Sequence, residues 1–94
     1  MPKYVIEREL PGAGQLTSDD LAAISAKSNE VLTAMAPRAQ WLQSYVTDDK
    51  LFCVYIADDP ETIREHARIG GFPVDAIHLV GTVIDPSTGE SAAA

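Results

Sequence analysis

Four segments of the chain carry the residue pattern of β-strands, and in the first of them hydrophobic and polar residues alternate with the two-residue period of a strand. The predicted strands cover residues 3–9, 40–47, 51–57 and 76–85. The first mixes β-branched and aromatic residues with charged ones, as is typical of a half-buried strand. A tight link at 48–50 joins the middle two, which indicates an antiparallel hairpin.

A helix is predicted between the first two strands. It begins near Thr17 or Ser18, either of which can cap its N-terminus, and the acidic residues that follow suit the positive end of a helix. Pro37 closes the segment. Hydrophobic residues and one serine recur along it at helical spacing: Leu21, Ile24, Ser28, Val31, Leu32 and Met35.

A second helix is predicted over residues 58–69, and two glycines follow it. Ile63 and Gly70 lie on its inward stripe, and His66 borders that stripe because it follows Ile63 by three residues. Gly70 and Gly71 end the helix, since glycine accepts the left-handed backbone found at helix C-termini. A boundary histidine bonded to a nearby carbonyl is the ordinary explanation for His66, and a functional site is the other.

The element order β-α-β-β-α-β is typical of the ferredoxin-like fold of the α+β class, in which a four-stranded antiparallel sheet carries two helices on one face. Right-handed crossovers predict the strand order 4-1-3-2. The fold name implies no iron–sulfur cluster, because one cysteine cannot hold one. We expect a ferredoxin-like domain over residues 1–86 and a flexible C-terminal tail over residues 87–94.

The second face of such a sheet is left open by the helices. We expect this open face to carry Val5, Trp41, Tyr45, Cys53 and Tyr55, which is too apolar a set to leave in water. A second subunit or a bound ligand would cover it. The opposite side of the third strand, expected against the helices, is purely apolar: Phe52, Val54 and Ile56.

Charge and composition narrow the range of partners. The 94 residues carry a formal net charge of −7, which disfavours nucleic acid and anionic membranes as partners because both need a basic surface. No segment matches a signal peptide or a membrane-spanning run. With one cysteine no internal disulfide forms, so a reducing compartment is the simplest context and we expect a cytoplasmic protein.

Side chains of the types that bind metals gather on the expected open face. Glu7 and Glu9 lie on the first strand and Cys53 on the third, and His78 joins them if its strand turns the neighbouring apolar residues towards the helices. Borderline transition metals accept carboxylate, thiolate and imidazole. Each of these residues also has an ordinary explanation without a metal. Paired glutamates on a strand usually lie at a solvated edge, and a lone cysteine usually fills apolar space. A single histidine on a strand usually has no functional role. Their convergence on one face indicates a metal site.

Catalytic motifs are not found in the sequence. PGAG at 11–14 lacks the lysine and the spacing of a phosphate-binding loop, and GG at 70–71 ends a helix instead of opening one. No serine lies in a nucleophile elbow. The sequence therefore favours a binding function over catalysis.

Four stretches of the sequence stand out when taken together: YVIERELPGAG, WLQSYVTDDKLFCVYIA, REHARIGGFP and TVIDPST. They resemble a family of small bacterial ferredoxin-like proteins of unassigned function that includes a nickel-binding branch. The resemblance runs from about residue 2 to residue 88, and SYVTDDK and EHARIGGFP are its most specific parts.

This resemblance implies a homodimer of ferredoxin-like subunits, with a nickel ion held by side chains from the sheet and its neighbours. The positions that match the family pattern and could ligate the metal are Glu7, Glu9, Tyr45, Cys53 and His66. The pattern has a histidine where this chain has Gln43, and an amide is a poor substitute for imidazole on nickel. His66 and the glutamates are expected on opposite sides of the sheet, so they could meet only around a sheet edge or across a dimer contact.

Three functions are compatible with these patterns. The first is a cytosolic homodimeric metal-binding protein, with nickel as the preferred metal. The second is a small dimeric α/β-barrel-type enzyme, an oxygenase or isomerase, which acts on an apolar ligand in a pocket with His66 or Glu7 in it. Its expected lining is Tyr4, Tyr45, Trp41 and Phe72. The third is a protein-interaction module whose open face docks to another protein.

Overall fold

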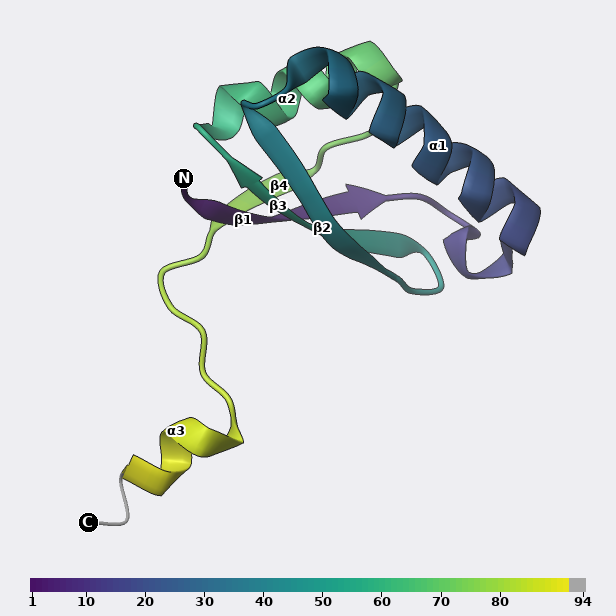
Figure 1. Ribbon diagram of the computed structural model, residues 1–94. Coiled ribbons are helices and arrows are strands. Elements are labelled where there is room, and N and C mark those ends of the chain that lie inside the picture. The colour runs from purple at the N-terminus through teal and green to yellow at the C-terminus, as the bar shows by residue number, and fades with distance from the viewer. Residues whose placement is uncertain (92–94) are drawn as a thin grey trace.

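The computed structural model describes residues 1–91 and has the predicted ferredoxin-like α+β architecture. Its elements are β1 (Lys3–Glu9), η1 (Ala13–Gln15), α1 (Ser18–Met35), β2 (Ala39–Val46), β3 (Lys50–Ala57), α2 (Pro60–Gly70), β4 (Ala76–Leu79) and α3 (Pro86–Ser91). The four strands form one antiparallel sheet in the order β2-β3-β1-β4, which is the predicted order read from the other edge. Helices α1 and α2 lie on one face of this sheet (Figure 1).

Local signals start both long helices, and the predicted glycine ends α2. At the start of α1 the Thr17 hydroxyl accepts a hydrogen bond from the Asp20 N–H, and the Asp20 carboxylate accepts one from the Thr17 N–H. Asp59 caps α2 by accepting a hydrogen bond from the Thr62 N–H at 2.8 Å. Gly71 follows α2 with a φ of 73°, a left-handed conformation that favours glycine.

The inward face of the sheet, which packs against the helices, carries the hydrophobic core. Tyr4 and Ile6 of β1 lie directly opposite Tyr55 and Cys53 of β3, and all four are buried against Ile63 of α2. Directly paired residues of an antiparallel sheet point to the same side. Cys53 and Tyr55 therefore face the helices, and the prediction that they lie on the open face is wrong.

The other side of β3 carries Phe52, Val54 and Ile56, which are only partly buried and face away from the helices. This is the reverse of the predicted orientation. Both sides of β3 are apolar, so alternation alone cannot show which side faces the core. The register with β1 decides it, because the inward side of β1 is fixed by Tyr4 and Ile6.

Strand β4 is shorter than predicted, since it ends at Leu79 instead of residue 85. The pairing stops there because β1 begins at Lys3. Tyr4 lies opposite Leu79, and the Val80 N–H donates to the Lys3 carbonyl. The chain beyond has no strand left to pair with, and Val83 there is 69% exposed. The pattern that predicts a longer strand is therefore an exposed apolar segment.

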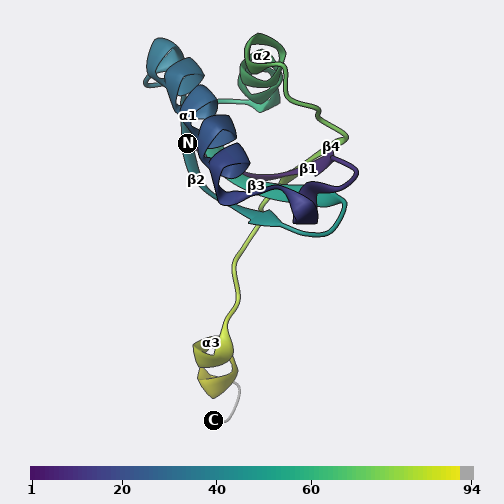
Figure 2. The same ribbon diagram turned by 90° about the vertical axis from the view of Figure 1, so that its right-hand side faces the viewer.

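Residues 81–91, which we call the C-terminal arm, extend away from the sheet. Figure 2 and Figure 1 both show the arm on the side of the sheet opposite α1 and α2, with α3 at its far end. The predicted tail over residues 87–94 begins inside α3, and residues 92–94 lie outside the described part of the chain. Within residues 1–91, no helix is both long enough and apolar enough to cross a membrane.

Candidate functional site

The residues predicted to bind metal lie on two sides of the sheet. Glu7 follows the outward side of β1, and Tyr45 the outward side of β2, where it is 57% exposed. Cys53 is buried on the inward side, and His66 lies on α2 above that side. Among residues 1–91, no three His, Cys, Asp or Glu side chains lie close enough together to hold one metal ion.

A β-bulge in β2 separates Trp41 from Tyr45, although their spacing places them on one face of a regular strand. Trp41 pairs with Tyr55, but the next pair joins Gln43 to Val54, so Leu42 is an extra residue in the ladder. Trp41 therefore faces the helices, which makes its predicted place on the open face wrong. Tyr45 keeps its predicted outward position, and its hydroxyl accepts a hydrogen bond from the Gln43 amide at 2.6 Å.

One carboxylate–imidazole pair forms on the open face. Val5 pairs with His78 across β1 and β4, which turns His78 to the same side as Glu7. The His78 Nε2 and Glu7 Oε1 atoms are 3.1 Å apart, and the Lys50 amine lies 3.8 Å from the other Glu7 carboxylate oxygen. This pair supplies one nitrogen and one oxygen donor, which suits half of a site for a divalent transition metal.

The other predicted ligands on this side lie further from that pair. Tyr45 is opposite Phe52, which is opposite Glu7, so Tyr45 and Glu7 are two strand spacings apart, or roughly 10 Å. Glu9 is exposed and lies two residues along β1 from Glu7. Within one subunit, Glu7 and His78 are therefore in direct contact on the open face, whereas Tyr45 and Glu9 lie apart from this pair.

His66 lies at the centre of the interior between α1, α2 and the sheet. It is 1% exposed, and its Nε2 atom is 3.2 Å from the Ser28 hydroxyl on α1. Its ring stacks on Phe72 and tilts against Tyr55, with a centroid distance of 5.4 Å in each case. Burial, and secondarily the nearby Arg8 charge, lower the pKa of His66. The imidazole is therefore neutral near pH 7.

The glycines after His66 have distinct roles. A Cβ atom on Gly70 would lie 2.3 Å from Cε2 of Phe72, so only glycine lets the Phe72 ring rest against this turn of the helix. Gly71 supplies the left-handed cap. The sequence IGGFP therefore ends α2 and seats Phe72 beside His66, where the two rings stack.

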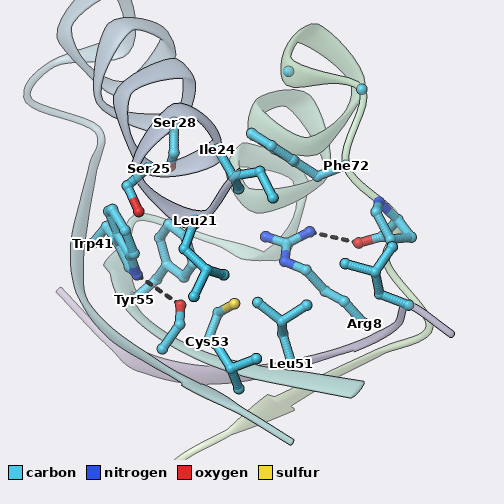
Figure 3. Close-up of a pocket in the computed structure, with 16 residues that line it drawn as sticks. Arg8, Leu21, Ile24, Ser25, Ser28, Trp41, Leu51, Cys53, Tyr55 and Phe72 are labelled. Carbon is cyan, nitrogen blue, oxygen red and sulfur yellow. Dashed lines mark hydrogen bonds between the residues drawn. The ribbon is translucent and has the colours of Figure 1, made fainter. Parts of the chain in front are cut away.

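A pocket of about 400 Å³ lies between the helices and the inward face of the sheet (Figure 3). The hypothesis of an apolar ligand predicts such a cavity lined by Tyr4, Tyr45, Trp41 and Phe72. Trp41 and Phe72 do line it, whereas Tyr4 is in the core and outside the lining, and Tyr45 lies on the other face of the sheet. His66 reaches the pocket through Ser28, which is part of the wall.

Arg8 is a pocket residue that the sequence analysis does not identify. Its side chain extends from β1 into the pocket and is 4% exposed, and its Nη1 atom donates to the Pro73 carbonyl at 2.5 Å. The guanidinium carbon lies 5.9 Å from the ring centroid of Tyr55 and 5.7 Å from that of Phe72. Arg8 alternates in step with Tyr4 and Ile6, so the strand period itself places it inward.

Tyr55 is part of the pocket wall, and its pKa is shifted as well. Burial raises the pKa of its hydroxyl, and the Arg8 charge partly opposes that rise. Because a tyrosine already titrates well above neutral pH, Tyr55 is an uncharged phenol near pH 7. The pocket therefore combines neutral polar groups with one cation.

Comparisons with known proteins relate the chain to one family. The family model described as "Nickel responsive protein SCO4226-like" matches residues 4–80. Among solved structures, the chain is similar to the crystal structure of SCO4226 from Streptomyces coelicolor A3(2), with a TM-score of 0.73 and 16% sequence identity over 87% of this chain and 99% of that chain. At this identity the likeness concerns the fold alone. No curated protein matches the chain.

Proposed function

The chain belongs to the SCO4226-like family of nickel responsive proteins, and we propose on that basis that it is a cytosolic homodimer that binds a divalent transition-metal ion, nickel first, on its open sheet face. Family membership agrees with the resemblance seen in the sequence. The printed description speaks of nickel responsiveness, so direct binding of the ion to this chain is the step that we add. A single free cysteine fits a reducing compartment.

The observation that carries the metal proposal is the Glu7–His78 pair. The two side chains come from adjacent strands and are already in contact at 3.1 Å. Their exposed fractions, 30% for Glu7 and 57% for His78, leave them accessible to an ion from solution. The positively charged Lys50 amine beside Glu7 repels an incoming metal ion. The Lys50 side chain is 42% exposed, however, and can move away from Glu7 into solvent.

One Glu7–His78 pair supplies only two ligand atoms, which do not complete a metal site. A second subunit would have to supply further ligands, so the proposed metal site depends on the dimer. In a twofold dimer the same surface of each subunit meets its copy. Pairing two open faces would therefore bring a second Glu7–His78 pair towards the first and give four donors. Water supplies the remaining positions, because nickel commonly takes more than four ligands in oxygen and nitrogen sites.

The open face carries exposed apolar side chains of the kind that a second subunit usually covers. Phe52, Val54 and Ile56 lie side by side along β3 and are only partly buried in the single chain. The C-terminal arm lies on this same side of the sheet (Figure 1 and Figure 2), and its residues Val83 and Ile84 are 69% and 75% exposed. A second copy would bury both groups, and a small domain gains stability from such burial.

Calorimetric titration of the purified full chain with Ni²⁺ tests the proposal. We expect one ion per two chains. Replacement of a ligand should cost at least about tenfold in affinity, so Glu7→Gln and His78→Gln should each weaken binding by that factor or more. Cys53→Ser is the matched control, because Cys53 is a buried residue on the other side of the sheet and its replacement should leave binding unchanged.

The same experiment tests the ligand set implied by the resemblance. Glu9→Gln, Tyr45→Phe and His66→Gln complete that set. Loss of binding in Cys53→Ser or His66→Gln together with full binding in His78→Gln would move the metal to the helix side and overturn the Glu7–His78 assignment. A wild-type chain that takes up no Ni²⁺ at micromolar concentrations would overturn metal binding itself.

A further inference from the structure

Arg8 has an incomplete set of interactions for a buried cation. The side chain is 4% exposed, and its one hydrogen bond goes to an uncharged acceptor, the Pro73 carbonyl. The Nη2 atom is buried and has no hydrogen-bond partner in the part of the chain that the structure describes. Within residues 1–91, none of the ion pairs includes Arg8. A buried charge normally has a counter-charge, because the loss of hydration is costly without one.

The surroundings of Arg8 compensate for this charge only in part. The faces of Tyr55 and Phe72 lie within 6 Å of the guanidinium carbon, a distance at which aromatic rings attract a cation. The titratable neighbours His66 and Tyr55 are neutral near pH 7, as their shifted pKa values indicate. The protein therefore supplies no negative charge to this end of the pocket from the side chains that contact Arg8.

The unpartnered nitrogen faces the open space of the pocket. In Figure 3 the hydrogen bond of Arg8 leaves one side of the guanidinium group, and the other terminal nitrogen lies on the opposite side, within the pocket. The rest of the wall is mainly apolar. It includes Leu21 and Ile24 of α1, Leu51 of β3, and Trp41 of β2. The indole N–H of Trp41 donates a hydrogen bond to the Ser44 hydroxyl at 3.0 Å and so is not free for a ligand.

We propose that this pocket binds a small organic monocarboxylate with an apolar body, whose carboxylate pairs with Arg8 and whose body lies against Leu21, Ile24 and Trp41. A carboxylate offers the one negative charge and the acceptor oxygens that the guanidinium lacks. The volume of about 400 Å³ lies within the range of small-molecule sites. A phosphate would bring more charge than one arginine neutralises, into a wall with no second cation.

This inference is independent of the proposed metal site. Arg8 and the pocket lie on the inward face of the sheet, whereas Glu7 and His78 lie on the outward face. Either function can fail while the other stands. A ligand in the pocket would also touch α1 and the segment after α2, so its binding would stabilise the contacts between the helices and the sheet.

Trp41 makes the proposal directly testable, because it is the only tryptophan of the chain and lines the pocket. The full chain is titrated at pH 7 with octanoate, with octan-1-ol and with inorganic phosphate, while Trp41 fluorescence and the heat of binding are followed. A charge-assisted hydrogen bond should make octanoate bind about tenfold or more tightly than octan-1-ol, which has the same tail without the charge. Phosphate should give no change.

Variants separate the charge from the cavity. Arg8→Gln should remove the preference for octanoate over octan-1-ol, whereas Arg68→Gln, an exposed arginine on α2, should retain it. Ile24→Phe should fill part of the pocket and weaken both ligands, and it leaves Trp41 as the single tryptophan. Should Arg8→Gln fail to fold, the comparison of the two ligands on the wild-type chain still decides the question. Equal affinity for octanoate and octan-1-ol, or no binding of octanoate at millimolar concentrations, would overturn the proposal.

Discussion

At the scale of single residues, we expect His66 to make the stability of the fold depend on pH. Its imidazole is buried, and that burial together with the Arg8 charge lowers its pKa. The unfolded chain takes up a proton near the ordinary value of about 6.5, whereas the folded chain takes it up only at lower pH. More protons are then bound by the unfolded state, so the free energy of unfolding should decrease as pH falls below about 6.5.

Urea unfolding between about pH 7.5 and about pH 5.5 measures this effect. His66→Gln removes the titrating ring, so its free energy of unfolding should fall less over that range than that of the wild type. His78→Gln is the control, because His78 is exposed and its replacement should leave most of the wild-type fall in place. Parallel curves for wild type and His66→Gln would show that another group titrates.

The sequence predicts the placement of single residues wherever one strong signal decides it. His66 comes three residues after Ile63, and that spacing correctly places it on the inward side of α2. Arg8 follows the same rule on β1, yet an inward arginine contradicts the usual surface preference of this residue. The Glu7–His78 contact depends on how β4 pairs with β1, which no local pattern contains.

At the scale of the elements, β2 and β3 mark the limit of what periodicity can predict. Both sides of β3 are apolar, so its orientation depends on pairing with β1 and not on its own sequence. In β2 the extra residue Leu42 reverses the alternation between Trp41 and Gln43. These two features move Trp41 and Cys53 from the predicted open face to the pocket wall.

The N-terminal cap of α1 provides a prediction at this scale. Thr17→Ala removes the hydroxyl that accepts from the Asp20 N–H, and the loss of such a cap costs about 1 kcal/mol. The first turns of α1 carry Leu21 and Ile24 of the pocket wall, so the variant should also change Trp41 fluorescence. Urea unfolding and emission spectra are the measurements. Ser18→Ala, one residue further on, should stay close to the wild type, and an equal loss in both variants would contradict a specific capping effect.

At the scale of the whole molecule, the order of the elements predicts the fold but not the overall dimensions of the chain. The order β-α-β-β-α-β and right-handed crossovers are enough to predict the sheet β2-β3-β1-β4. The radius of gyration is 15.1 Å, against roughly 12 Å for a compact chain of this length. The C-terminal arm accounts for the excess, because it extends away from the domain (Figure 1).

The apolar open face and the exposed C-terminal arm together predict a homodimer in which both surfaces are buried. Val54 lies at the centre of the open face, paired with Val5 on one side and Gln43 on the other. Val54→Glu would place a carboxylate within the apolar surface that a dimer of open faces buries, where the charge loses its hydration. Because Val54 is only partly buried in one chain, the subunit itself should still fold.

Light scattering coupled to size-exclusion chromatography measures the result. The wild type should elute as a dimer and Val54→Glu as a monomer, with the helix content by circular dichroism unchanged. Ile69→Glu introduces the same charge on α2, at a residue 53% exposed on the other side of the sheet, and should remain dimeric. A chain that ends at Val80 lacks Val83 and Ile84 and should dimerise more weakly, because the arm can no longer pack against the second subunit. A monomeric wild type would remove both the dimer and the four-donor metal site that depends on it.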